Sequence, residues 1–307
     1  MKKKIFFIIN PISGTGEEQS IVKLITESID QEVYDYKIAF TKAQFHAMEL
    51  AQQAVDEEYD VVAAVGGDGT MHEVGKQLIG TKTALAIFPK GSGNGMALNM
   101  KIPLKLNKAI RLLKECKTVK IDTVSINDEK FIGIAGVGFD ALIAAKFATY
   151  GKRGLRSYVA LTFKELNDYV AETYELYIDG QKYERNAFMI SFANSAQFGN
   201  NAVVAPGATI TDGIIDICVM QQFPPITLPL LTMRLFTNTI DKSKYMEILK
   251  GKEIFLKQKS KFVHLDGEPY ELGQELHIKI NPKSLNIVVP GYREVKNFQL
   301  QNIAAKL

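Results

Sequence analysis

The sequence predicts two domains of different class, an α/β domain with a parallel sheet and then a domain of antiparallel sheet. Two observations predict this. Apolar and amphipathic runs alternate regularly up to about residue 118, which is the pattern of a parallel sheet with crossover helices. From Val119 onward short β-like runs follow one another, which is typical of antiparallel sheet. We therefore divide the chain into residues 1–118 and 119–290.

The elements follow from these patterns. In the first domain, strands are predicted at 5–9, 33–40, 60–65 and 84–89, and helices at 17–29, 42–57, 71–79 and 106–114. In the second, strands are predicted at 119–126, 131–135, 173–178, 187–192, 214–220, 253–258, 262–265, 276–280 and 285–289. A helical stretch at 141–170 is broken around Gly151 and Gly154.

Composition excludes several classes of protein. With 46% hydrophobic and 23% charged residues over 307 positions, the chain can bury two cores. The net charge of +3 arises from 37 basic and 34 acidic residues, a balance that favours no nucleic-acid partner. Cys116 and Cys218 are far apart and form no CxxC pattern, which indicates a reducing, cytoplasmic location without a disulfide framework.

No membrane-spanning segment is predicted. The apolar run at 5–9 is too short for a secretory signal. The apolar stretch at 217–233 contains Pro224, Pro225 and Pro229, which a simple spanning helix would not tolerate. We therefore expect any membrane contact to be peripheral.

Three predicted strands of the first domain each run into a loop rich in glycine and small polar residues. The loops are Asn10–Gly16, Gly66–Thr70 and Gly91–Gly95. Such loops gather at the carboxyl edge of a parallel sheet, where glycine lets backbone N–H groups approach phosphate oxygens. Each loop alone could be an ordinary turn, but the three together favour a polyphosphate site.

Asp68 is the informative residue in these loops. A carboxylate would repel a phosphate unless a cation or a transferable proton lies between them, which suggests Mg²⁺ or a general base. Alternatively, Asp68 caps a helix that begins at Thr70 or Met71. No Walker A loop is present, and the GxGxxA match at Gly136–Ala141 lacks the βαβ context of a dinucleotide site.

Together these motifs resemble the catalytic domain shared by diacylglycerol kinases, sphingosine kinases and related bacterial lipid kinases. The likeness extends through Gly138-Phe139-Asp140, Asp212-Gly213-x-x-Asp216 and Leu265-Asp266-Gly267-Glu268, so it covers nearly the whole chain. It implies an NAD kinase-like, Rossmann-like N-terminal domain and a β-sandwich-like C-terminal domain with the active site between them. It also implies that residues 291–307 return to the first domain.

The resemblance implies particular roles for residues. ATP and Mg²⁺ would be the cofactors, and Asp266 is the first candidate for the base that takes the lipid hydroxyl proton, with Asp68 second and Glu268 beside them. From local sequence alone, Asp266-Gly267 is equally a hairpin turn. Asp212 and Asp216 would hold a structural Mg²⁺, although such acids can also be solvated turn residues. The ATP site would be lined by Asn10, Ser13, Gly14, Gly67, Asp68, Gly69, Thr70, Glu73, Gly91, Ser92, Gly93 and Asn94.

The function that the resemblance implies is transfer of the γ-phosphoryl group of ATP to a primary hydroxyl of a membrane lipid, diacylglycerol or a relative first. His72 and the Gly91–Gly95 run look more like sphingosine kinases, so a sphingoid base is the alternative acceptor. An NAD kinase is disfavoured by the LDGE and GSGN segments, and a non-catalytic nucleotide or lipid sensor by the presence of both Asp68 and Asp266.

The expected partners are a lipid at the membrane surface and no nucleic acid, and a homodimer is compatible with the sequence. The stretch at 141–170 mixes apolar residues with Lys146, Lys152, Arg153 and Arg156. It is either a border of the lipid site that touches anionic headgroups or an amphipathic core helix with a solvated basic face.

Overall fold

The computed structural model describes residues 2–12, 18–150, 155–166 and 168–290. The chain divides into two compact units, one of Met1–Ile121 with the segment that begins at Ser284, and one of Asp122–Lys283. This division lies three residues beyond the boundary expected from sequence. The expected return of residues 291–307 to the first domain lies outside the described residues.

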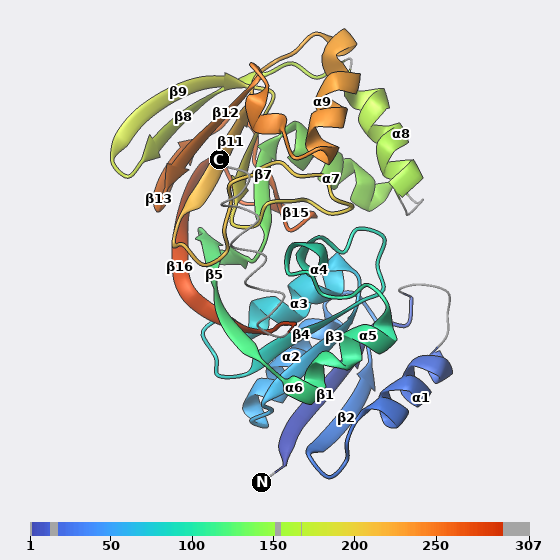
Figure 1. Cartoon of the computed structure of the whole chain (residues 1–307). Coiled ribbons are helices and arrows are strands. Elements are labelled where there is room, and N and C mark those ends of the chain that lie inside the picture. Colours follow the sequence, from blue (N-terminus) through green and yellow to red (C-terminus); the bar gives the residue numbers. More distant parts are fainter. Residues whose placement is uncertain (1, 13–17, 151–154, 167, 291–307) are drawn as a thin grey trace, which may run out of the picture. The chain divides into compact units, whose positions relative to one another are not determined.

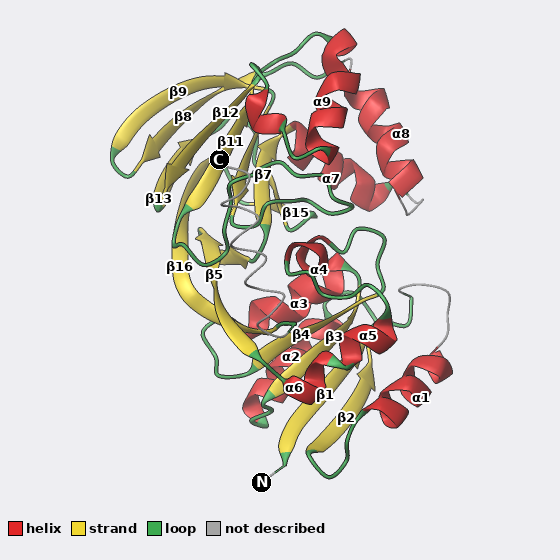
Figure 2. Ribbon diagram, viewed as in Figure 1, coloured by secondary structure: helices red, strands yellow, loops and turns green. Residues whose placement is uncertain are grey.

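Unit 1 is built on a parallel sheet (Figures 1 and 2). Its strands lie in the order β2 (Tyr34–Phe40), β1 (Lys3–Ile9), β3 (Val61–Gly66), β4 (Ala84–Pro89), followed by the last residues of β16 (Glu275–Val288). Neighbouring strands pair in parallel throughout. Strands β3 and β4 are buried at every residue, as expected when helices cover a parallel sheet. The predicted parallel sheet is therefore confirmed.

The helices of unit 1 are α1 (Glu18–Ser28), α2 (His46–Asp56), α3 (Asp68–Leu78), α4 (Gly95–Asn99), α5 (Leu106–Ile110) and α6 (Leu112–Glu115). Alanines on α2 and Val74 and Leu78 on α3 are buried, which accounts for their amphipathic sequence pattern. The single helix predicted at 106–114 is wrong. The α-helical ladder is interrupted at Arg111, whose carbonyl accepts from the N–H of Lys114, three residues later.

Unit 2 contains two antiparallel groups of strands. One has the order β12 (Met246–Gly251), β11 (Ile215–Met220), β10 (Met189–Ala193), β7 (Ile134–Gly138), β14 (Phe262–Leu265), β15 (Glu268–Glu271). The other joins the first part of β16 to β13 (Glu253–Lys257), β8 (Glu172–Ile178) and β9 (Gln181–Ala187), with β5 (Thr118–Ile126) and β6 (Glu129–Phe131). Inward-facing residues of both groups form one apolar cluster that includes Tyr174, Phe192 and Ile254. The predicted antiparallel domain is therefore confirmed.

Helices cover the remaining face of the β12–β15 sheet. They are α7 (Phe139–Thr149), α8 (Leu155–Leu166) and α9 (Leu228–Phe236), with the short helices η1 (Pro225–Thr227) and η2 (Ile240–Lys242) (Figure 1). A second apolar cluster joins Ile143 of α7, Leu161 of α8 and Leu231 of α9 to strand residues such as Cys218. The predicted helical stretch at 141–170 corresponds to α7 and α8, and the predicted break at 151–154 lies outside the described residues.

The strands differ from the sequence prediction at several places. The sequence does not predict β9, β12 or β15, each of which lies at the end of its strand order. The two runs predicted at 276–280 and 285–289 are one strand, β16, that continues through Pro282. The N–H of Lys283, within that strand, donates to the buried carboxylate of Asp122 over 2.7 Å. The Asp122 carboxylate therefore accepts this N–H in the part of β16 that lies between its pairing with β13 and its pairing with β4.

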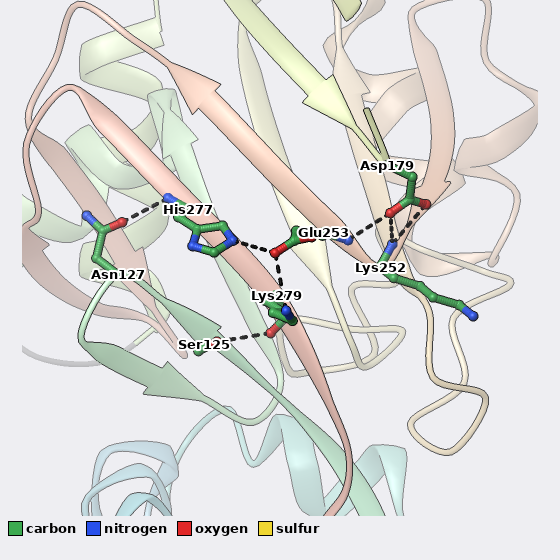
Figure 3. A network of polar contacts seen from close by, with 7 residues as sticks. All are labelled: Ser125, Asn127, Asp179, Lys252, Glu253, His277 and Lys279. Carbon is green, nitrogen blue, oxygen red and sulfur yellow. Dashed lines mark hydrogen bonds and ion pairs between the residues drawn. The ribbon is translucent and has the colours of Figure 1, made fainter. Parts of the chain in front are cut away.

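A polar network ties the β8–β9 turn to β13 and β16 on the exposed side of unit 2 (Figure 3). Asp179 occupies an Asp-Gly turn with a φ of 49° and accepts from the N–H groups of Lys252 and Glu253, the latter over 2.9 Å. The Glu253 carboxylate in turn accepts from His277 over 2.8 Å and from Lys279 over 3.3 Å. These two bonds lower the pKa of Glu253. The Asp179 carboxylate therefore has a structural role, because it attaches the β8–β9 turn to the start of β13.

Candidate active site

Three loops of unit 1 follow three neighbouring strands at one edge of the parallel sheet. Asn10 follows β1, Gly67 follows β3, and Gly91 lies two residues after β4. Strands β3 and β4 end level, since Gly66 pairs with Pro89. The fold therefore brings the starts of all three glycine loops to one carboxyl edge, as the alternation of strands and helices predicts.

The second and third loops touch through their backbones. A Cβ added at Gly91 would lie 2.5 Å from the Cα of Gly67 and 3.1 Å from Oδ1 of Asn94. A Cβ added at Gly67 would lie 3.2 Å from the Cα of Gly91. Only residues without side chains allow this approach, which leaves both backbones exposed to a ligand at the sheet edge. Glycine at these positions is therefore required by the close packing of the two loops.

Asp68 links the same two loops. One of its carboxylate oxygens accepts a hydrogen bond from the N–H of Gly95, the first residue of α4, over 2.7 Å. Its other oxygen lies 2.7 Å from where a Cβ of Gly93 would be. The expectation that Asp68 precedes a helix starting at Thr70 or Met71 is wrong, since α3 begins at Asp68 and Gly67 is the N-cap. The carboxylate instead holds the start of a different helix.

Two asparagine side chains fix the shape of the loops. Nδ2 of Asn10 donates to Oγ1 of Thr70 over 3.1 Å, while Oδ1 of Asn10 accepts from the N–H of Ile12 over 3.0 Å. Asn94, at a φ of 49°, both accepts from the N–H and donates to the carbonyl of Gly91, over 3.0 and 2.7 Å. The first loop is thereby joined to α3, and the third loop is closed on itself.

The other residues predicted for the nucleotide site are distributed as follows. Glu73 is half-buried on α3, Gly69 lies in the first turn of that helix, and Ser92 is exposed in the third loop. Ser13 and Gly14 lie outside the described residues. The described members thus lie along one edge of unit 1, and their contacts with a nucleotide stay a prediction.

Asp266 forms a hairpin turn in unit 2. With Gly267 it joins β14 to β15, and the φ values of 50° and 91° match the type I′ turn expected of Asp-Gly. Glu268 begins β15 and is half-buried. The Asp266 carboxylate also accepts three backbone hydrogen bonds, from Ile132 (3.0 Å), Gly133 (2.7 Å) and Ile134 (3.0 Å). Three N–H donors hold this carboxylate in one orientation, so the turn is more than a bare reversal of the chain.

The sequence did not predict a buried cluster of polar side chains that is joined to this turn. Nε2 of His264 lies 3.1 Å from Oδ2 of Asp140, which also accepts from Oγ of Ser191 over 3.2 Å. Because the N–H of Gly267 donates to Nδ1 of His264 over 3.4 Å, we assign the ring proton to Nε2. A Cβ at Gly136 would lie 2.2 Å from Asp140 and 2.6 Å from His264. The sequence shows the Gly138-Phe139-Asp140 motif, but His264, the partner of Asp140, lies 124 residues away and could not be paired with it from sequence.

Asp212 and Asp216, predicted as metal ligands, have other partners. Asp216 is 1% exposed and lies 3.1 Å from Nζ of Lys250. Asp212 is exposed and accepts from the N–H of Ile214 in its own turn. Among the described residues no group of three or more His, Cys, Asp or Glu side chains could hold a metal ion. An ammonium group thus supplies the counter-charge of Asp216 here, so the pair does not fit a shared cation well, and its metal role stays a prediction.

Comparisons with known proteins agree with this architecture. The diacylglycerol kinase catalytic domain family matches residues 4–126, and the YegS C-terminal NAD kinase beta sandwich-like domain matches residues 133–289. A probable lipid kinase YegS-like of Citrobacter koseri is 31% identical over 78% of this chain and 83% of its own length. An uncharacterised protein of Synechocystis is 29% identical over 92% of this chain and 69% of its own.

A solved structure shows the same fold. A diacylglycerol kinase from Bacillus anthracis superposes with a TM-score of 0.72 at 19% identity, over 94% of this chain and 97% of that one. The fold and the glycine loops define a two-domain kinase with an α/β part and a β-sandwich part. The chain belongs to the YegS-like lipid kinase family, which carries the diacylglycerol kinase catalytic domain.

Proposed function

We propose that this kinase transfers the γ-phosphoryl group of ATP to a primary hydroxyl of a membrane lipid, with diacylglycerol as the first candidate. The observation that carries the proposal is the close approach of Gly67 and Gly91, held by the hydrogen bond from Gly95 to Asp68. This close approach places backbone of the second and third loops side by side at one edge of the sheet. Such an edge suits the phosphates of a nucleotide.

The residues of unit 1 would bind and orient the donor. Backbone N–H groups of the second and third loops would approach the phosphate oxygens, and the N-terminus of α3 would add its dipole. Asp68 and the half-buried Glu73 supply carboxylate oxygens close to that helix start. A bound Mg²⁺ would neutralise charge on the phosphates and would prefer such oxygen ligands.

The residues of unit 2 would act on the acceptor. The lipid hydroxyl oxygen forms a bond to the γ-phosphorus as the bond from that phosphorus to the β-phosphate bridging oxygen breaks, and ADP leaves. The hydroxyl proton passes to a carboxylate, for which Asp266 is the first candidate and Asp68 the second. Three N–H donors aim the Asp266 carboxylate, and Glu268 lies one residue beyond the turn.

A screen of lipid acceptors tests the proposal. Radiolabelled ATP is supplied with mixed micelles of diacylglycerol, of sphingosine or of a monoacylglycerol, and NADP formation from NAD is measured in parallel. We expect a phosphorylated diacylglycerol and no NADP. If only sphingosine is phosphorylated, the acceptor is a sphingoid base rather than diacylglycerol. If only NAD is phosphorylated, lipid kinase activity is refuted.

A matched pair of variants tests the base. Asp266→Asn is compared with Asp179→Asn, because Asp179 occupies the other Asp-Gly turn whose carboxylate accepts backbone N–H groups (Figure 3). We expect Asp266→Asn to lower kcat by about 100-fold or more with ATP affinity unchanged, and Asp179→Asn to change kcat little. Equal losses in both variants would mean that Asp266 only shapes its turn. A large loss of ATP affinity in Asp68→Asn would assign that residue to the donor.

A lipid acceptor also requires contact with a membrane surface. In the part of the chain that the structure describes, no helix is long and apolar enough to cross a bilayer. The basic residues Lys152 and Arg153, and the side chain of Arg156, lie outside the described residues. Charge reversal at these three positions tests that stretch, since unchanged binding to anionic vesicles would exclude it as a headgroup site.

A further inference from the structure

Helix α9 and the turn before it expose an unusual amount of apolar surface. Ile226 on η1 is 87% exposed, and Leu230, Met233 and Phe236 on α9 are 49%, 54% and 55% exposed. Leu230 and Met233 are three residues apart and lie on one side of α9, while Ile226 lies in the turn just before the helix. We call these four side chains the outer face of α9.

Packing among the described residues of unit 2 does not account for the outer face. Leu231 is 3% exposed, and Leu228 and Leu235 pack against the same apolar cluster. These three residues already provide the inward stripe by which α9 is attached to the sheet (Figure 1). A surface helix normally carries polar residues opposite such a stripe. Contacts among the described residues therefore do not explain why the outer face of α9 is apolar.

The segment that carries the outer face is poor in charge, and the nearest carboxylate along the chain is that of Asp241 in η2. From Gln221 to Ile240 the sequence contains no aspartate or glutamate, and Arg234 is the only charged residue. The Arg234 side chain donates to the carbonyl of Thr239 over 3.0 Å, at the end of the helix. An apolar face without carboxylates can enter the acyl region of a bilayer without desolvating a negative charge and without repulsion from anionic headgroups.

The size of the outer face argues against a second protein as its occupant. A helix of nine residues is about 13 Å long and about 10 Å wide, so its outer side offers on the order of 100–200 Å². A stable protein interface buries about 800 Å² on each partner. A bilayer has no such threshold, because each apolar side chain that enters it contributes separately.

We propose that the outer face of α9 inserts into the surface of a lipid bilayer and anchors the kinase there. This inference rests on the proposed function in that a lipid acceptor must be met at a membrane, and it names the surface that makes the contact. Pro224 and Pro225 stiffen the turn before the helix, and Pro229 restricts the backbone in the first turn of α9. They hold Ile226 outward without an ordering cost at the moment of binding.

Vesicle binding tests the proposal without any need for catalysis. The full-length protein is sedimented with vesicles of phosphatidylcholine and phosphatidylglycerol. The double variant Leu230→Gln/Met233→Gln is compared with Val33→Gln/Leu104→Gln, whose parent residues lie in unit 1 and are similarly exposed, at 47% and 50%. We expect the α9 variant to lower the vesicle partition coefficient at least about tenfold, and the control to leave it unchanged. Ile226→Gln repeats the test at a residue that makes little packing contact.

Three results would overturn the proposal. Wild-type protein that fails to bind vesicles, or α9 variants that bind as wild type does, would exclude this surface. A wild-type dimer that the α9 variants convert to monomer without a change in vesicle binding would assign the face to a second copy.

The proposed function can fail separately. If the α9 variants lose vesicle binding but no lipid is phosphorylated by wild type, the anchor stands without the proposed reaction. If a short-chain diacylglycerol in free solution is phosphorylated equally by all variants while vesicle binding never changes, the reaction stands without the anchor.

Discussion

Gly91→Ala is the substitution that most directly tests the interlocked loops. The added Cβ would lie 2.5 Å from the Cα of Gly67, a distance that real Cβ atoms do not adopt. The atom that the new Cβ meets is the backbone Cα of Gly67, so no side-chain rotation relieves this contact. The second and third loops must therefore separate until the contact reaches at least 3.4 Å.

The separation has a calculable consequence. Overpacking of this kind lowers the free energy of unfolding by about 1–3 kcal/mol. A displacement of catalytic backbone by about 1 Å lowers the rate by on the order of 100-fold. Because Asp68 bonds to Gly95 across the same gap, its carboxylate would lose its partner or be drawn out of place. We therefore expect weaker ATP binding as well as lower stability.

Titration with a fluorescent ATP analogue and urea unfolding measure the two effects. Gly67→Ala, with a closest contact of 3.2 Å, should be less severe. Gly207→Ala is the control, because its Cβ would lie 4.0 Å from the nearest atom, on Asp216, at an ordinary φ. If Gly91→Ala binds ATP as tightly as Gly207→Ala and is as stable, the loops do not depend on this contact and the reasoning is refuted.

Two further predictions concern unit 2. Arg185 lowers the pKa of Glu247 below its usual 4.5 through two hydrogen bonds of 2.7 and 2.9 Å. The charged form of this carboxylate is therefore more favoured in the folded state than in the unfolded chain. The pair should raise the free energy of unfolding by no more than about 1 kcal/mol above pH 4.5. The difference in urea midpoint between wild type and Glu247→Gln should vanish as the pH falls below that value. A difference in midpoint that grows in acid would contradict this prediction. His264→Leu should lower the free energy of unfolding by about 1–3 kcal/mol, since it leaves buried Asp140 without that donor, and should lower kcat with little change in KM. Because Nδ1 of His264 accepts from the N–H of Gly267, next to Asp266, we expect His264 to position that turn. His264→Gln, which keeps an N–H toward Asp140, should therefore recover part of the kcat, and equal kcat in both variants would contradict this role.

The strands that the sequence did not predict share a physical property. β9, β12 and β15 lie at the ends of their strand orders, and several of their residues are exposed or half-buried. An edge strand is defined by the neighbour that accepts its hydrogen bonds rather than by an apolar run of its own. The central strands β1, β3 and β4 were predictable because both of their faces are buried and their sequences are correspondingly apolar.

Asp-Gly pairs show where local sequence stops being informative. Asp179-Gly180 and Asp266-Gly267 both form turns with positive φ at both residues. The same Asp-Gly chemistry favours a turn at each, although the sequence prediction named only the one at Asp266. Only the tertiary structure distinguishes them, since one carboxylate accepts from β13 and the other from the segment before β7.

The sequence by itself determined the two fold classes, the glycine loops and their meeting at one sheet edge, because the periodicity of buried residues and the geometry of parallel strands are local properties. Tertiary structure alone decided three other things. It paired His264 with Asp140, gave Asp216 a lysine as counter-charge, and left the outer face of α9 exposed. Each depends on which distant segments pack together, and a pattern of neighbouring residues does not carry that information.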